Sequence, residues 1–283
     1  MTTSVFTRPR ARPRLAAVSS QQNLIAVNTE DELLAALTNL PRSDGSCFGR
    51  AINIVGNIYL RKTITLSSIH NGLTITSSSN ALINSSVDVK VMFDCLLTDR
   101  ITIENLTLGQ GCLSTFFAFV GQYTTIRNIT ILSGSSIVNL TKLVAKAGLR
   151  ILNCVCEVAS GVRLALGPTT QIPDAVISGN VRFSGGISQI AFGSSVISGN
   201  TNIGPWTTAG SARQTLNTSC FGNSFVGDIT ISNALSENNS IFGNSMGGFN
   251  ITTSATAGNN SIVGNTNVGA ISNAATDAVT SNT

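Results

Sequence analysis

Charged side chains are scarce in this chain of 283 residues. Asp, Glu, Lys and Arg make up 11% of the sequence, whereas an ordinary globular domain contains about 25%. The hydrophobic share of 42% is ample for a core, and disordered chains combine low hydrophobicity with high charge, so disorder is excluded. The polar surface must come from Ser, Thr, Asn and Gly, which favour strands and turns over helices.

Histidine, tryptophan and tyrosine are also rare, with one His, one Trp and two Tyr in the whole chain. Aromatic faces of the kind that stack against sugar rings are therefore few. Phosphate-binding, dinucleotide, zinc-protease and nucleophile-elbow motifs are absent. The single histidine, His70, precedes Asn71 and Gly72, and we expect it to be a solvated turn residue. These absences predict no cofactor and no bound metal.

Long apolar segments are missing as well. No segment approaches the run of about 18 apolar residues that a membrane span requires. The segment "LAAV" at 15–18 is shorter than the apolar region of about 7–15 residues in a secretory signal. We therefore expect neither a membrane span nor export through a cleaved signal.

The positive charge is confined to the N-terminal segment. Residues 1–14 contain four arginines and no acidic residue, and the remaining 13 basic side chains balance the 13 acidic ones. A neutral body offers no electrostatic surface for a nucleic acid backbone. The segment "RPRARPR" should be extended because proline disfavours helix in the residue before it. We expect residues 1–27 to be an anchoring arm that binds carboxylates of other proteins through Arg8, Arg10, Arg12 and Arg14.

Six cysteines show no metal-binding pattern. In "CVC" the two cysteines lie on the same face of a strand, whereas zinc sites usually place two to four residues between paired cysteines. We expect reduced, buried thiols in a protein made in a reducing cytoplasm. The cysteines are Cys47, Cys95, Cys112, Cys154, Cys156 and Cys220.

A short phrase recurs along the second half of the chain. A Gly-Asn pair with an apolar residue two positions before the glycine occurs five times there, with intervals of 20, 23, 21 and 21 between the asparagines. Less regular copies upstream place Asn105, Asn128 and Asn153 at the same position of the repeat, and Gly56-Asn57 and Asn80 extend this spacing toward the N-terminus. The five asparagines of the regular phrase are Asn180, Asn200, Asn223, Asn244 and Asn265.

Repetition at this period predicts a solenoid. Each unit holds short alternating runs such as "ITIENLTL" and has no room for a helix, which leaves a single-stranded parallel β-helix. We expect about ten coils of 21–25 residues between 52 and 270 and assign 52–283 to this domain. The asparagines should form a ladder along one edge, where Gly and Asn permit a sharp turn. As a turn residue, Asn244 should tolerate Ser at a cost of about 1 kcal/mol.

One helix is expected ahead of the coils. In "NTEDELLAALTNL" at 28–40, Thr29 can cap the helix and Glu32 can complete a Thr-x-x-Glu capping box. Leu33, Leu34 and Leu37 would form its apolar face. We assign 28–51 to this capping helix and a linker, placed over the open end of the solenoid, where a bare strand edge would invite aggregation.

The order of these motifs resembles the pectate-lyase-type right-handed β-helix, and especially the tailspikes and fibres of bacteriophages. The resemblance covers about residues 28–270 and includes "TEDELLAAL", "INIVGNIYLRKTITL", "GLTITSS", "ITIENLTL" and "TIRNITIL". It implies a right-handed coil, a homotrimer and a place in a virus particle after synthesis in the host cytoplasm. The clustered Asp residues, His-Gly and Arg-x-Lys motifs typical of polygalacturonases are absent.

Three functions follow from these observations. We expect a structural virion protein, a tailspike, fibre or capsid-surface protein held by its arm to other virion proteins and able to contact a host glycan or receptor. The alternative is a polysaccharide-degrading spike whose carboxylates are Asp94, Asp99 and Glu104, since carboxylate pairs about 5–10 Å apart can hydrolyse glycosides. A second alternative is a bacterial surface adhesin or filament subunit. Solvated loop and turn residues are the simpler interpretation of the three acids.

Overall fold

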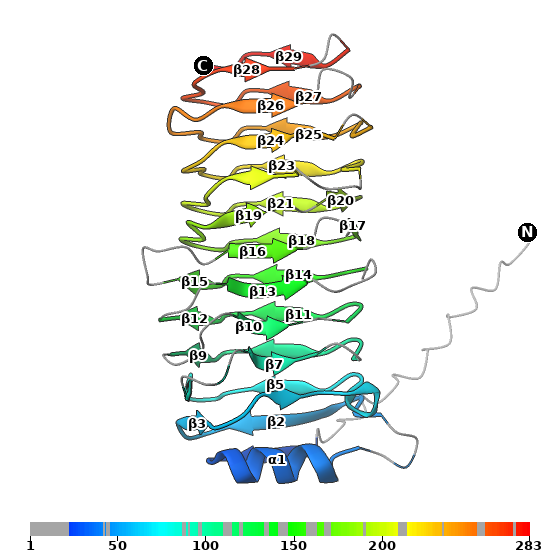
Figure 1. Ribbon diagram of the computed structural model, residues 1–283, viewed down its shortest axis with the longest axis vertical. Helices are drawn as coiled ribbons and strands as arrows, with labels where there is room; N and C mark the ends of the chain where they lie inside the picture. The colour runs from blue at the N-terminus through cyan, green and yellow to red at the C-terminus, as the bar shows by residue number, and fades with distance from the viewer. Residues whose placement is uncertain are drawn as a thin grey trace, which may run out of the picture.

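Stacked coils form a straight rod in the computed structural model, with one helix at its N-terminal end (Figure 1). The two ends of the described chain lie at opposite ends of the rod. The structure describes residues 23–41, 43, 46–86, 89, 91–95, 98–109, 115–118, 121–132, 136–140, 147–156, 163–166, 171–188, 191–208, 214–233, 235–253, 258–273 and 276–283. The arginines assigned to the arm and Cys112 lie outside these residues.

The longest sheet runs the whole length of the rod. It has twelve described strands, all paired in parallel. Ten of them cover the stretch 52–270, where about ten coils were expected, and one further strand lies on either side of it. The pairing order is β1 (Asn23–Val27), β2 (Arg50–Ile54), β5 (Thr74–Thr76), β8 (Thr102–Glu104), β11 (Thr125–Arg127), β14 (Arg150–Leu152), β18 (Val176–Ser178), β21 (Val196–Ser198), β23 (Ser219–Phe221), β25 (Ser240–Phe242), β27 (Ser261–Val263) and β29 (Ala278–Thr280). The last residues assigned to the arm therefore form β1.

A second sheet also follows the rod. Its order is β4 (Ile64–Thr65), β7 (Val91–Asp94), β10 (Thr115–Ala118), β13 (Ser136–Leu140), β16 (Arg163–Leu166), β19 (Gly186–Ser188), β22 (Trp206–Thr207), β24 (Ile229–Ile231), β26 (Ile251–Thr253) and β28 (Ile271–Ser272). Two shorter sheets complete the coils. They contain β3 (Ile58–Leu60), β6 (Leu82–Ser85), β9 (Thr107–Leu108), β12 (Thr130–Ile131) and β15 (Val155–Cys156), and β17 (Gln171–Pro173) and β20 (Ala191–Gly193). The parallel β-helix expected from the repeat is confirmed.

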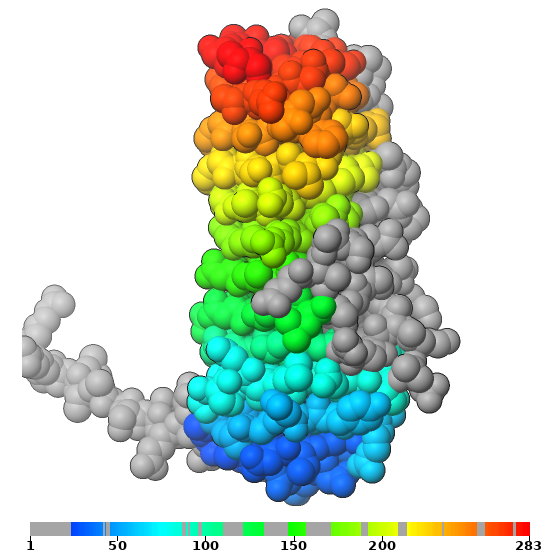
Figure 2. All heavy atoms as spheres, turned by 90° about the vertical axis from the view of Figure 1, so that its left-hand side faces the viewer, coloured from blue at the N-terminus to red at the C-terminus, as the bar shows by residue number. Residues whose placement is uncertain are grey.

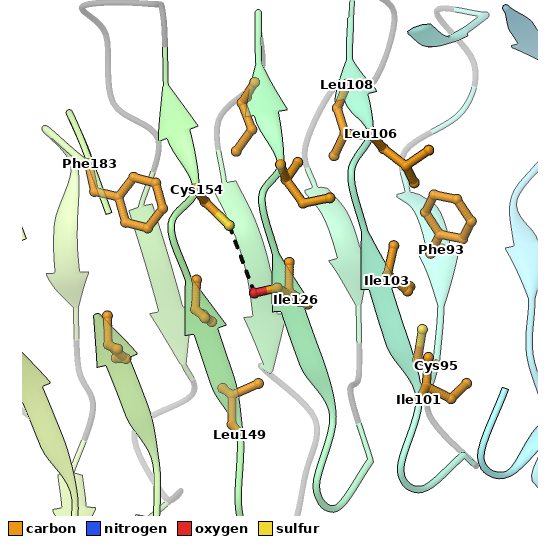
Figure 3. Packing of buried hydrophobic residues seen from close by; sticks show 14 of the residues in the cluster. Phe93, Cys95, Ile101, Ile103, Leu106, Leu108, Ile126, Leu149, Cys154 and Phe183 are labelled. Carbon is orange, nitrogen blue, oxygen red and sulfur yellow. Dashed lines mark hydrogen bonds between the residues drawn. The ribbon is translucent and has the colours of Figure 1, made fainter. Parts of the chain in front are cut away.

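The interior is a set of aligned apolar columns. Along the long sheet the central residue of each strand from β2 to β27 points inward and is buried, and the register aligns these residues coil on coil. Figure 3 shows Ile103 and Ile126 in this column with Leu106, Leu108 and Phe93 around them. The column consists of Ile52, Ile75, Ile103, Ile126, Ile151, Ile177, Ile197, Cys220, Ile241 and Ile262. The repeated Ile therefore supplies the core.

The described cysteines belong to this interior. All five are buried and free of disulfides: Cys47, Cys95, Cys154, Cys156 and Cys220. Burial raises the pKa of Cys154 to about 12, so the thiol is protonated at neutral pH and unreactive. Figure 3 shows its Sγ directed toward the carbonyl of Ile126.

The helix α1 (Glu30–Asn39) closes the N-terminal end of the rod, as expected (Figures 1 and 2). The Thr29 hydroxyl accepts a hydrogen bond from the Glu32 N–H at 3.2 Å. The Glu32 carboxylate accepts instead from the Asn28 N–H at 2.6 Å, one residue before the position that a capping box requires. Leu33 and Leu37 are buried against the core, so the helix covers apolar side chains that would otherwise meet water.

The expectation for His70 was wrong. Its side chain is buried, with 6% of the residue exposed, in the short 3-10 helix η1 (Ser68–His70). Its ring contacts the backbone of α1 as well as its own coil. The dipeptide Asn71-Gly72 does make a turn, but the preceding histidine faces the capping helix, which a local turn signal does not show.

Candidate binding site at one corner of the rod

The corner before each strand of the long sheet from β2 to β27 is a left-handed turn. Residues with φ between 48° and 59° occupy it in seven coils: Arg100, Tyr123, Asp174, Ser194, Asn217, Asn238 and Asn259. Later coils use the short polar residues that tolerate this conformation. Arg100 and Tyr123 are exceptions, because a bulky side chain at positive φ is uncommon and is strained by about 1–2 kcal/mol. Strain of this kind often marks a functional position.

Arg100 lies between two aromatic rings. Its guanidinium carbon is 5.8 Å from the ring centroid of Phe48 and 5.8 Å from that of Tyr123, within the range of cation–π attraction. Each ring covers a glycine: a Cβ on Gly72 would lie 2.3 Å from the Phe48 ring, and one on Gly148 would lie 2.4 Å from the Tyr123 ring. The absence of side chains at these two positions lets the rings lie against the backbone, so the rings are held in place.

Polar groups complete this corner site. Phe48, Asn71, Asp99, Arg100, Gln122 and Tyr123 line a cleft of about 310 Å³. Asp99 is fixed by its surroundings, because its N–H donates to Asn71 Oδ1 at 2.8 Å and its Oδ1 accepts from the Gln122 N–H at 2.8 Å. The Phe48 residue is 42% exposed and Tyr123 is 50% exposed. The corner site thus presents two ring surfaces, a guanidinium, a carboxylate and two amides to solvent.

This arrangement offers groups that can bind a sugar. Ring surfaces can cover the C–H groups of a sugar, the amides and carboxylate can bond its hydroxyls, and a guanidinium binds carboxylates. Glycoside hydrolysis requires a second carboxyl at a defined separation, and Asp99 is the one acid among the described residues that lines the cleft. Within the part of the chain that the structure describes, no group of three His, Cys, Asp or Glu side chains could hold a metal ion.

The other two predicted acids lie elsewhere. Asp94 ends β7 in the second sheet, beside Thr65 of β4. Glu104 ends β8 in the long sheet, and its carboxylate forms an ion pair with the guanidinium of Arg127 on the next strand. The structure therefore places Asp99 in the corner site and leaves Asp94 and Glu104 outside it.

The five asparagines of the regular phrase stack along the opposite corner. All five are buried. From Asn200 onward, the Oδ1 of each accepts from both the N–H and the Nδ2 of the asparagine one coil before it, at 2.8–3.0 Å. Each Nδ2 also donates to a backbone carbonyl of the preceding coil, as in Asn223 to Ile197 at 3.0 Å. The ladder continues to Asn282, which the sequence interpretation missed because the last interval shortens to 17 residues.

The looser upstream copies were assigned to the wrong position. Asn105, Asn128 and Asn153 have φ of 53–57°, and they align with the glycine of the regular phrase and not with its asparagine. Cys154, which follows Asn153, instead donates its N–H to Asn180 Oδ1 at 2.9 Å and starts the ladder. Asn and Gly are both suited to a left-handed turn, so the pattern alone could not separate the two positions.

A second buried ladder was not foreseen. The Oδ1 of Asn260 accepts from the N–H and Nδ2 of Asn239 at 3.1 and 3.0 Å, and Asp277 accepts from Asn260 in the same way. Asn239 and Asn260 directly follow the left-handed corner residues Asn238 and Asn259, and Asp277 occupies the same position one coil later. The pairs "NN" at 238–239 and 259–260, again 21 residues apart, were the signal in the sequence.

Comparisons with known proteins find similar structures but no similar sequence. No family model matches the chain, and no curated protein sequence does. The crystal structure of the Dettilon tailspike protein aligns over 92% of this chain with a TM-score of 0.53 and 10% identity. The A-module of the Azotobacter vinelandii mannuronan C-5 epimerase AlgE6 aligns over 92% of this chain and 88% of its own, with a TM-score of 0.43 and 11% identity.

The similarity between this chain and the tailspike chain is one of fold. This chain spans 61% of the length of that tailspike chain. Within the described residues, no helix is long and apolar enough to cross a membrane. The chain has a tailspike-like parallel β-helix fold.

Proposed function

We propose that the chain is a structural rod of a bacteriophage virion that attaches the particle to its host by binding a surface glycan at the corner site. The observation that carries the proposal is the corner site itself, with Arg100 held between the exposed rings of Phe48 and Tyr123. The fold shared with a tailspike protein supports the virion part of the proposal.

The construction of the rod fits a mechanical role. Parallel pairing joins the coils along the whole rod, and buried amide ladders add bonds between the coils of its second half. Such a solenoid bends little because each coil is bonded to both neighbours. The basic segment with Arg8, Arg10, Arg12 and Arg14 precedes β1 at the capped end, so it would anchor this end to acidic surfaces of other virion proteins. A homotrimer would place three corner sites around one axis.

The corner site indicates which glycans would bind. Its guanidinium favours a sugar that carries a carboxylate or another anionic group, and its two rings offer stacking faces on either side of that charge. The Asp99 carboxylate accepts one backbone hydrogen bond and can accept others from hydroxyls. An acidic capsule or lipopolysaccharide of the host is therefore the expected ligand.

The rival function is cleavage of that polysaccharide. It is favoured by one observation, the position of Asp99 in the cleft beside Arg100. Asp94 and Glu104 do not line this cleft, and Glu104 is bonded to Arg127. We therefore propose binding without turnover.

Binding and cleavage can be measured with the same purified chain. Tyr123→Asn removes one ring and Arg100→Asn removes the cation, and Asn suits the left-handed conformation of both positions. Thr125→Ala, on the outer face of the neighbouring strand, is the matched control. We expect each site variant to weaken binding to acidic host polysaccharide by about tenfold or more, as loss of a stacking or charged contact would, while the control binds normally.

Two results would contradict the proposal. Equal binding by the wild-type chain and both site variants would exclude the corner site. Release of oligosaccharide that is abolished by Asp94→Asn together with Asp99→Asn would establish the polysaccharide-degrading function instead.

A further inference from the structure

The last turn of α1 contains a carbonyl whose usual partner is missing. In an α-helix the carbonyl of Leu37 would accept from the N–H of residue 41. Residue 41 is proline, which has no N–H. The Nε2 of His70 lies 3.1 Å from this carbonyl oxygen and takes the place of the missing donor. The neighbouring carbonyl of Leu40 accepts from the guanidinium of Arg50.

Both contacts of the imidazole fix its tautomer. A carbonyl can only accept, so the Nε2 facing Leu37 carries a proton. The backbone N–H of Ser67 lies 3.0 Å from Nδ1 and can only donate, so Nδ1 carries none. The ring that fits this site is therefore neutral. It joins the helix that caps the rod to the coil beneath it, across 33 residues of sequence.

We propose that His70 is a proton-sensitive clasp that holds the end cap at neutral pH and loosens it when the imidazole becomes charged. Protonation puts a second donor on Nδ1, opposite the Ser67 N–H, and leaves that partly buried N–H without this acceptor. It also places a charge on a residue that is 94% buried from solvent. The end cap means α1 and its contacts with β1, β2, β3 and His70 of η1.

Two features oppose this effect. A positive charge near a helix C-terminus is favourable, and the Ser67 hydroxyl, 3.4 Å from Nδ1, could rotate to accept its proton. The first benefit is reduced because the Arg50 guanidinium already occupies this helix end. The hydrogen bond to the hydroxyl is limited because the Ser67 N–H lies nearer to Nδ1, at 3.0 Å, so the new proton would still face this N–H. The loss of the acceptor therefore dominates.

The charged groups around His70 do not stabilise an imidazolium. A groove of about 380 Å³ between α1 and the first coils is lined by Lys62 and His70 together with Leu34, Leu37, Thr38, Thr65 and Ile69. Lys62 is positive. The acids of α1 lie in its first turn, at the other end of the helix. Asp94 is on β7, opposite Thr65 in the neighbouring strand, and does not line this groove.

Amide hydrogen exchange of the full chain tests the clasp. Between about pH 7.5 and about pH 5.5, a range in which imidazoles change charge, protection of residues 30–39, corrected for intrinsic exchange, should fall about tenfold or more. Protection of 241–262 should stay constant. His70→Gln has no proton to gain in this range, so its cap should lose no protection over it. Glu30→Gln, which weakens the other end of α1, should keep the wild-type pH dependence.

Constant protection of the cap in the wild-type chain, or an equal fall in His70→Gln, would overturn the proposal. A second measurement does not depend on the variant. Because His70 is the only histidine, the ring nitrogens give unambiguous ¹⁵N resonances in the intact protein. We expect a protonated Nε2 and an unprotonated Nδ1 at about pH 7.5. The opposite tautomer, or a ring already charged there, would contradict the clasp.

Discussion

Asn223→Ala should be among the most damaging substitutions of a polar residue in the rod. Asn223 is 2% exposed, and its amide bonds both neighbouring coils. Its Oδ1 accepts from the Asn200 N–H at 3.0 Å and from the Asn200 Nδ2 at 2.8 Å. Its Nδ2 donates to the Ile197 carbonyl at 3.0 Å. Alanine leaves the buried Asn200 N–H and the Ile197 carbonyl without these partners.

The expected loss follows from these two groups. An unsatisfied buried donor or acceptor costs about 1–3 kcal/mol, so two such groups should lower the free energy of unfolding by about 2–6 kcal/mol. The nearby indole of Trp206 reports the transition, because it is the only Trp in the chain and is fully buried. Urea unfolding followed by its fluorescence therefore measures the stability of this part of the rod.

Asn250→Ala is the matched control, since Asn250 is exposed. It should change the free energy of unfolding by no more than about 0.5 kcal/mol. A loss below about 1 kcal/mol for Asn223→Ala, or equal losses for the two variants, would refute the argument that the ladder carries stability.

Three other outcomes are expected. Gly199→Ala should cost about 1 kcal/mol of unfolding free energy, because alanine would adopt a φ of 62° there in otherwise open space. Gly179→Ala should cost more, because its Cβ would lie 2.3 Å from the Oδ1 of Asn153. Equal urea midpoints for the two variants would disprove this clash. Burial alone would raise the pKa of Glu30, but bonds from Arg61 outweigh it and lower the pKa. The stability from this pair is therefore complete above the ordinary value of 4.5 and lost as pH falls through the lower pKa of the folded state. Glu30→Gln should thus unfold earlier in urea at neutral pH and converge with the wild type in acid, and a constant difference would contradict the assignment. Deletion of residues 2–20 should leave a folded rod, by circular dichroism, that no longer enters particles, and normal incorporation would exclude the anchor.

The repeat could be predicted from the sequence because every coil has the same two structural requirements. An inward Ile and a sharp corner recur at a nearly constant interval, so the asparagine spacing predicted both the fold and the edge on which Asn180 and Asn265 lie. The environment of these side chains was not predicted. Asn244 was expected to be a turn residue that tolerates Ser for about 1 kcal/mol, but it is 1% exposed and bonded to two coils. Its replacement should cost nearly as much as that of Asn223.

The grouping of residues at the corner site was not predicted from the sequence, for a different reason. Phe48, Arg100 and Tyr123 come from three loops, and loop lengths vary from coil to coil. A signal was nevertheless present, since Arg100 and Tyr123 each lie three residues before an isoleucine of the inner column, Ile103 and Ile126. The burial of His70 had no such signal, because its partner on α1 is selected by Pro41 and by the docking of the helix.

Adsorption of particles to host cells tests the central claim most directly. Particles that carry Tyr123→Asn should contain the rod in normal amount, by mass spectrometry, and should adsorb about tenfold more slowly than wild-type particles, since one stacking face of the corner site is lost. Particles that carry Thr125→Ala should adsorb normally. Adsorption of the Tyr123→Asn particles at the wild-type rate, with the rod present, would contradict attachment through this site.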